Sequence, residues 1–169
     1  MKNFLANIAA EENCELISRD EKISLGKGAY MVETTHQFAF NYKQSEILVI
    51  CSFGAHAMAT IFTRLQKQSD RATFSITTRS HFSTLFSRNK NRIRINSEDS
   101  NLTHVIKENP SIKTLTEICR HAEFEPFITG KNEENNYIIR TTFQLIFPER
   151  ESVMKPLIQF YKDMIDQSG

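Results

Sequence analysis

Residues 71–94 contain six basic side chains and no acidic one. Lysine and arginine hold phosphate groups and aromatic rings stack on bases, so basic residues interleaved with Phe74, Phe82 and Phe86 could bind an anionic partner. Residues 71–97 carry a net charge of +6, whereas residues 1–70 carry −1 and residues 98–169 carry −4. The candidate anion-binding residues are Arg71, Arg79, Arg88, Lys90, Arg92 and Arg94.

The same stretch also has a purely structural interpretation. Its phenylalanines recur at a spacing typical of a core, and the pI of about 7.7 lies below the usual range of nucleic-acid-binding domains. Strand alternation places Arg92 and Arg94 on one exposed face, with Ile93 and Ile95 pointing inward. We therefore expect no nucleic-acid binding at physiological salt, and little loss of stability on Arg92→Ala.

No motif in the sequence predicts a catalytic centre or a cofactor site. Gly26 and Gly28 lack the further glycines of a phosphate-binding loop. No histidine lies within four residues of another, so no local pair of metal ligands exists. The sequence predicts no cofactor and no metal, and it leaves an enzymatic activity open without supporting one.

Three cysteines, Cys14, Cys51 and Cys119, are odd in number and widely spaced. This pattern disfavours a disulfide framework, and we expect reduced, mostly buried thiols in a cytoplasmic protein. Cys119 precedes Arg120 and His121, which could activate an exposed thiol. It also continues an apolar helical stripe, which predicts that it is buried and inert.

The clearest structural pattern is the alternation of apolar and polar residues over 137–147, which predicts a long strand with one buried face. Residues 152–167 change to helical spacing and predict a long C-terminal helix that packs on the sheet. A first helix is expected over 3–12, a short strand over 14–18 and a turn at 26–28. Four further strands, expected as an antiparallel meander, cover 36–42, 47–53, 57–65 and 72–78.

Shorter elements complete the expected order. We expect a short helix from Ser80, a strand over 92–96, helices beginning near Ser97 and Ser111, and a strand over 123–129 that pairs with 137–147. The near-continuous apolar run 47–53 predicts a central strand covered on both faces. The sequence thus predicts a single α+β domain, residues 1–169, with an antiparallel sheet of about six to seven strands and helices packed on one face.

These features favour a non-catalytic binding or interaction module, with another protein or a second copy of the chain as its partner. Two alternatives stay open: a small-molecule-binding protein or enzyme with an apolar cavity between sheet and C-terminal helix, and a protein that binds nucleic acid or another anionic partner through residues 71–94. No apolar run approaches the roughly 20 residues that span a bilayer, so no membrane association is expected.

Overall fold

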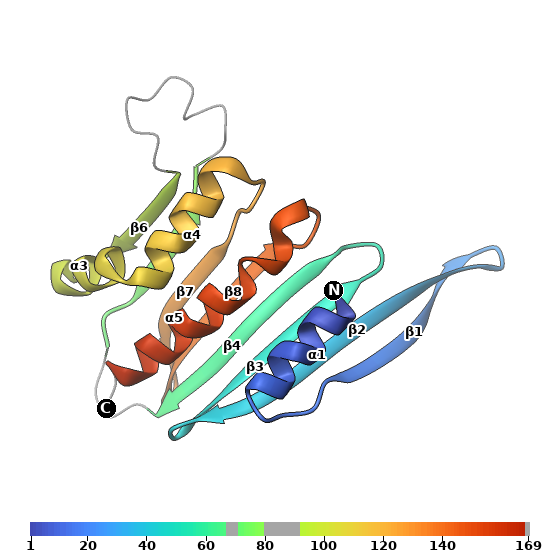
Figure 1. Ribbon diagram of the computed structural model, residues 1–169, viewed down its shortest axis with the longest axis horizontal. Helices are drawn as coiled ribbons and strands as arrows, with labels where there is room; N and C mark the ends of the chain where they lie inside the picture. Colours follow the sequence, from blue (N-terminus) through green and yellow to red (C-terminus); the bar gives the residue numbers. More distant parts are fainter. Residues whose placement is uncertain (67–70, 80–91, 168–169) are drawn as a thin grey trace.

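The computed structural model describes residues 1–66, 71–79 and 92–167. Within them the chain forms one antiparallel sheet of eight strands and four α-helices, which confirms the predicted α+β class with slightly more strands than expected. Helices α1, α4 and α5 lie across one face of the sheet, and α3 lies beside β6 (Figure 1). The helix predicted from Ser80 lies outside the described residues.

The strands are β1 (Ile17–Gly26), β2 (Ala29–Tyr42), β3 (Ser45–Phe53), β4 (Met58–Gln66), β5 (Phe74–Thr78), β6 (Ile93–Ser97), β7 (Phe127–Glu133) and β8 (Asn136–Gln144). The helices are α1 (Lys2–Glu11), α3 (Ser100–Glu108), α4 (Pro110–His121) and α5 (Met154–Asp166), and a 3-10 helix (Pro148–Glu151) precedes α5. No helix of the described ranges is long and apolar enough to cross a membrane.

The strand order is β1-β2-β3-β4-β8-β7-β5-β6, so β1 and β6 are the edge strands. Strands β1 to β4 form a meander, but β4 then pairs with β8 along its whole length, from Met58 opposite Gln144 to Gln66 opposite Asn136. The prediction that residues 72–78 continue the meander is therefore wrong, because β5 lies between β7 and β6. Alternation in a sequence specifies the face of each side chain and leaves the neighbouring strand undetermined.

The inner face of the sheet, which the helices cover, holds the core. One of the buried rows that cross it has each member opposite the next in the adjacent strand. The row consists of Phe38, Val49, Ile61, Thr141, Ile128 and Ile76. Its polar member lies beneath α5, where the Tyr161 hydroxyl donates to the Ile61 carbonyl at 2.7 Å and lies 3.0 Å from the Thr141 Oγ1.

On the outer face of the sheet, which no described helix covers, side chains of neighbouring strands contact one another. The guanidinium carbons of Arg64 and Arg140 lie 5.2 and 5.3 Å from the centroid of the Phe62 ring. Strand β3 buries Ile47 and Val49 on the inner face, whereas Leu48, on the outer face, is only half-buried. The prediction that this strand is covered on both faces is therefore wrong for the described part of the chain.

Strand β1 is longer than the short strand predicted over 14–18. It pairs with β2 from Ile17 opposite Gln37 to Gly26 opposite Ala29, and the predicted turn at 26–28 joins the two strands. Gly26 and Gly28 adopt positive φ there, at 84° and 79°, which glycine tolerates without steric cost. The β1–β2 hairpin extends beyond the layer of helices (Figure 1).

Candidate interaction surface

The structure does not gather the described basic residues of 71–94 on one surface. Arg94 is exposed on the outer face, where its Nε donates to Asn96 Oδ1 at 3.2 Å. Arg71 lies with its guanidinium carbon 5.6 Å from the centroid of Tyr137, an inner-face residue. Arg79 is exposed just after β5. Arg88 and Lys90 lie outside the described residues, and an anion-binding role for the whole set stays a prediction.

Arg92 departs most from the expectation, since only 2% of it is exposed. Its Nη1 donates to the carbonyls of Cys119 and Ala122 at 2.7 and 3.1 Å, and its Nε donates to the carbonyl of Arg79 at 3.1 Å. Its Nη2 forms an ion pair with Glu125 at 2.7 Å. The predicted placement of Arg92 beside Arg94 on an exposed face is therefore wrong: Arg92 satisfies the carbonyls at the C-terminal end of α4 and is not free to hold a partner. The expectation that Arg92→Ala costs little stability rested on that placement and no longer holds.

The histidines and acidic residues form no recognisable chemical centre. Within the described ranges, no three His, Cys, Asp or Glu side chains lie close enough together to hold a metal ion. His36 is buried on the inner face of β2, with its Nδ1 2.9 Å from Ser18 Oγ. Burial lowers the pKa of His36, and the nearby positive charge of Lys2 lowers it further. This favours the neutral imidazole, and hence a structural role in the β1–β2 pairing.

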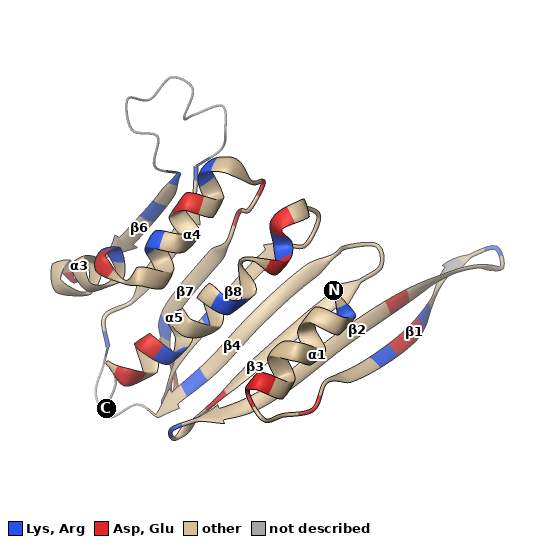
Figure 2. Ribbon diagram, viewed as in Figure 1, with Lys and Arg blue, Asp and Glu red and all other residues tan. Residues whose placement is uncertain are grey.

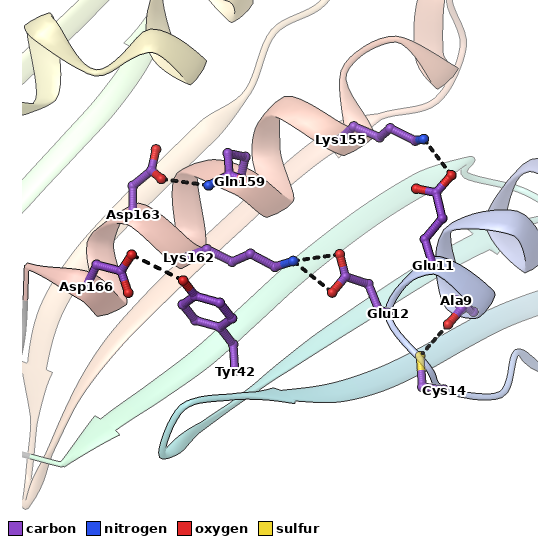
Figure 3. Close-up of polar contacts among 10 residues, drawn as sticks. All are labelled: Ala9, Glu11, Glu12, Cys14, Tyr42, Lys155, Gln159, Lys162, Asp163 and Asp166. Atoms are coloured by element: carbon purple, nitrogen blue, oxygen red, sulfur yellow. Dashed lines mark hydrogen bonds and ion pairs between the residues drawn. The ribbon is translucent and has the colours of Figure 1, made fainter.

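All three cysteines are free, and their environments differ. Cys51 lies on the inner face of β3 and Cys119 on the buried side of α4, and burial raises the pKa of both thiols to about 12. Cys14 is half-buried after α1, where its thiol donates to the Ala9 carbonyl at 3.3 Å (Figure 3). The expectation that Cys119 is buried is confirmed, in spite of its basic neighbours in the sequence.

We expect a thiol reagent at neutral pH to leave Cys51 and Cys119 unmodified in the native protein. In the native protein, burial shields both thiols and the raised pKa keeps them protonated. Unfolding removes both conditions, so both thiols should then react. Mass spectrometry of the labelled protein before and after denaturation checks this result. Rapid native labelling of Cys119 would contradict the burial of this thiol and would reopen a chemical role for it.

Between the sheet and the C-terminal helix, where an apolar cavity was expected, the described side chains pack against one another. Leu157, Phe160 and Tyr161 of α5 are fully buried there. The Phe160 ring contacts the rings of Phe74 and Tyr161 edge-on, with centroid distances of 6.4 and 6.3 Å. Open hollows lie elsewhere, for instance one of about 340 Å³ between β6 and α4 and one of about 550 Å³ beside Arg64 at the end of β4.

Polar contacts fix α1 to α5 and so determine how far the helical layer reaches. Lys162 on α5 contacts both carboxylate oxygens of Glu12 at 2.7 Å, and its ammonium lies 5.4 Å from the ring centroids of Phe40 and Tyr42 (Figure 3). Lys155, earlier on α5, pairs with Glu11 at 2.7 Å (Figure 3). Helix α1 therefore stays over the Tyr42 end of β2, next to α5, and the opposite end of β2 remains uncovered by the described helices.

The exposure of inner-face residues along β2 shows where the cover ends. His36 is 8% exposed, whereas Val32 and Tyr30, further along the same face, are 51% and 68% exposed. We call residues 17–35, the hairpin segment that contains this uncovered part, the overhang. Of the six large apolar residues exposed in the described ranges, three lie in it: Tyr30 and Val32 on the inner face, and Ile17 on the outer face.

The overhang also carries a run of four exposed charges, Arg19, Asp20, Glu21 and Lys22, on edge strand β1 (Figure 2). Asp20 accepts a hydrogen bond from Thr34 Oγ1 at 2.8 Å. Within the described part of the chain, none of these four side chains forms an ion pair. Charges on an edge strand are a common guard against indiscriminate pairing, and their pattern determines which strand can pair.

The sequence analysis missed this surface, because charged residues on both faces of β1 hide the alternation that marks a strand. The signal that could have found it is the turn at 26–28, since a turn next to one strand calls for a second strand before it. Comparison of the chain with protein-family models, curated proteins and solved structures finds no match, so its function is inferred from this geometry.

Proposed function

We propose that this chain is a non-catalytic interaction module that binds a protein partner through the overhang. The observation that carries the proposal is the exposure of Tyr30 and Val32, two residues apart on the inner face, in a segment of the hairpin that no described helix covers; Ile17 is exposed on the outer face of the neighbouring edge strand. Isolated apolar residues are common on protein surfaces, but a group of them beside an unpaired strand edge is typical of an interface.

The chemistry of the overhang supports a protein rather than a small molecule or a nucleic acid. An edge strand offers backbone N–H and C=O groups to another strand, and Ile17, Val32 and Tyr30 offer apolar contact area. Its charges are balanced, with two basic and two acidic residues on β1, which gives no preference for a polyanion. Three free thiols suit a reducing compartment, so we place this binding in the cytoplasm.

A site-specific photocrosslinker tests the proposal. Tyr30 is replaced by a photoreactive phenylalanine analogue in the living cell, where its exposure permits the change without loss of packing. We expect discrete adducts with protein after irradiation, because the side chain would lie within an interface. Mass spectrometry of each adduct identifies what is bound, whether another protein or a second copy of the chain.

Ile146 provides a matched control position. It is 68% exposed, as Tyr30 is, but it lies in the connection after β8, on the other half of the sheet. The analogue at this position should give few or no discrete adducts. Equal adduct patterns from the two positions, or no adducts from Tyr30, would show that the overhang is not a specific binding surface.

A further inference from the structure

The edge strand β1 carries a self-complementary pattern on the outer face of the sheet. Ile17, Arg19, Glu21 and Ile23 alternate with residues that point to the inner side, as their pairing with β2 shows. Read in either direction, the outer residues are apolar, charged, oppositely charged and apolar. An antiparallel copy of the same strand would therefore place each residue opposite one that it attracts.

Antiparallel geometry restricts how two copies of β1 can pair. Residues directly opposite each other either both exchange backbone hydrogen bonds or both do not, and these two types alternate along a strand. When two copies of β1 pair, the residue numbers of two directly opposed residues must therefore differ by an even number or be equal. Each allowed register then has a single residue at its centre, opposite its own copy.

We infer that the partner bound by the overhang is a second copy of this chain, with Asp20 of each copy opposite Asp20 of the other. Arg19 then lies opposite the partner's Glu21, and Ile17 lies opposite the partner's Ile23, each pair occurring twice by symmetry. The two eight-stranded sheets become continuous through β1. This inference rests on the proposed function, since it names the partner of the same surface.

A like-charge pair within the hairpin supports this partner. Glu21 lies directly opposite Glu33 in the β1–β2 pairing, an arrangement that destabilises an antiparallel pair. In the described part of the chain no cation pairs with either carboxylate. In the inferred register the partner's Arg19 extends the same row, next to Glu21, and supplies the missing positive charge.

The neighbouring registers fit less well. With Glu21 at the centre, Glu21 would face its own copy and Arg19 would face the partner's Ile23. With Arg19 at the centre, two guanidinium groups would meet and Ile17 would face the partner's Glu21. The inferred register has one unfavourable pair, Asp20 with its own copy, and each Asp20 already accepts a hydrogen bond from Thr34.

The register also gives the exposed tyrosine a neighbour. Tyr30 lies opposite Ser24 in the hairpin. In the inferred register, Ser24 lies opposite the partner's Leu16, the residue just before β1 of the partner. The overhang of each copy therefore runs towards the α1 end of the other. Tyr30 and Val32 then lie on the inner side of the combined sheet, where contact with the second copy can reduce their exposure to water.

Charge reversal tests the inference with the full chain in sedimentation equilibrium or native mass spectrometry. We expect the unmodified protein to be dimeric. Arg19→Glu and Glu21→Arg alone should each weaken the dimer by about tenfold or more, because two attractive pairs become repulsive. The double variant Arg19→Glu/Glu21→Arg should restore dimerisation, since the exchange recreates both opposite-charge pairs.

Two variants fix the register. Asp20→Asn should strengthen the dimer, because it removes the like charges at the centre, and Lys22→Glu should leave it almost unchanged, because Lys22 faces the partner's Ser18. In the register centred on Glu21, Asp20 would face the partner's Lys22. That register therefore predicts that Asp20→Asn and Lys22→Glu each weaken the dimer. Weakening of the dimer by both variants would therefore overturn the inferred register.

The outcome also separates this inference from the proposed function. A chain that stays monomeric at its highest soluble concentration, while Tyr30 crosslinks to another protein, overturns self-pairing and leaves the interaction module standing. A chain that is dimeric but insensitive to Arg19→Glu and Glu21→Arg overturns pairing through β1. Crosslinks from Tyr30 to a second copy, with restoration by the double variant, support both.

Discussion

Replacing Arg92 by alanine is expected to lower the free energy of unfolding by about 3–5 kcal/mol, because it leaves buried carbonyl groups without a donor and removes a large buried side chain. The substitution removes four hydrogen bonds at once and leaves the Cys119 and Ala122 carbonyls without their donor. It also opens a cavity where a large side chain is almost fully buried. Denaturant unfolding followed by circular dichroism measures the change.

Two variants show that the loss comes from these contacts. Arg92→Lys keeps the positive charge but lacks the planar fork that reaches several carbonyls, so it should recover only part of the stability. Arg94→Ala should cost under about 0.5 kcal/mol, because Arg94 is exposed and bonds only to Asn96 among the contacts of the described residues. Equal losses for Arg92→Ala and Arg94→Ala would contradict the burial of Arg92.

The position of Arg92 shows why sequence alternation gave the wrong face. Alternation holds inside a regular strand, but β6 begins at Ile93, and Arg92 lies one residue before it. The end of α4, about 30 positions further along the chain, supplies the carbonyls that make burial of this charge favourable. No local pattern carries that information, because helix and strand are brought together only by the fold.

Strands and helices with one apolar face were predicted from the sequence more accurately than those without one. The alternation of β8 and the helical stripe of α5 both place their apolar residues in the core, since burial of one face selects the register. Strand β1 has charges on both faces and no apolar face to reveal it. The candidate interaction surface was missed for the same reason. Hydrophobic periodicity reveals residues that face the core, and the overhang lies outside the core.

The second large effect is expected at Phe143, in the middle of the long predicted strand. Phe143→Ala should lower the free energy of unfolding by about 3–5 kcal/mol, the usual cost of removing a buried aromatic ring and leaving a cavity. The ring is almost fully buried on the inner face, and it meets the Phe124 ring edge-on at a centroid distance of 5.2 Å. Edge-to-face contact adds to the loss of buried apolar area.

Gln144 is the natural control, because it is the next residue of the same strand and points to the opposite face. It is exposed, so Gln144→Ala should cost under about 1 kcal/mol. A strand that slipped by one residue would exchange the two environments, and the larger loss would then move to Gln144. Denaturant unfolding of both variants therefore reports the register of β8 against β4, and equal losses would show that the pairing of Ala59 with Phe143 is wrong.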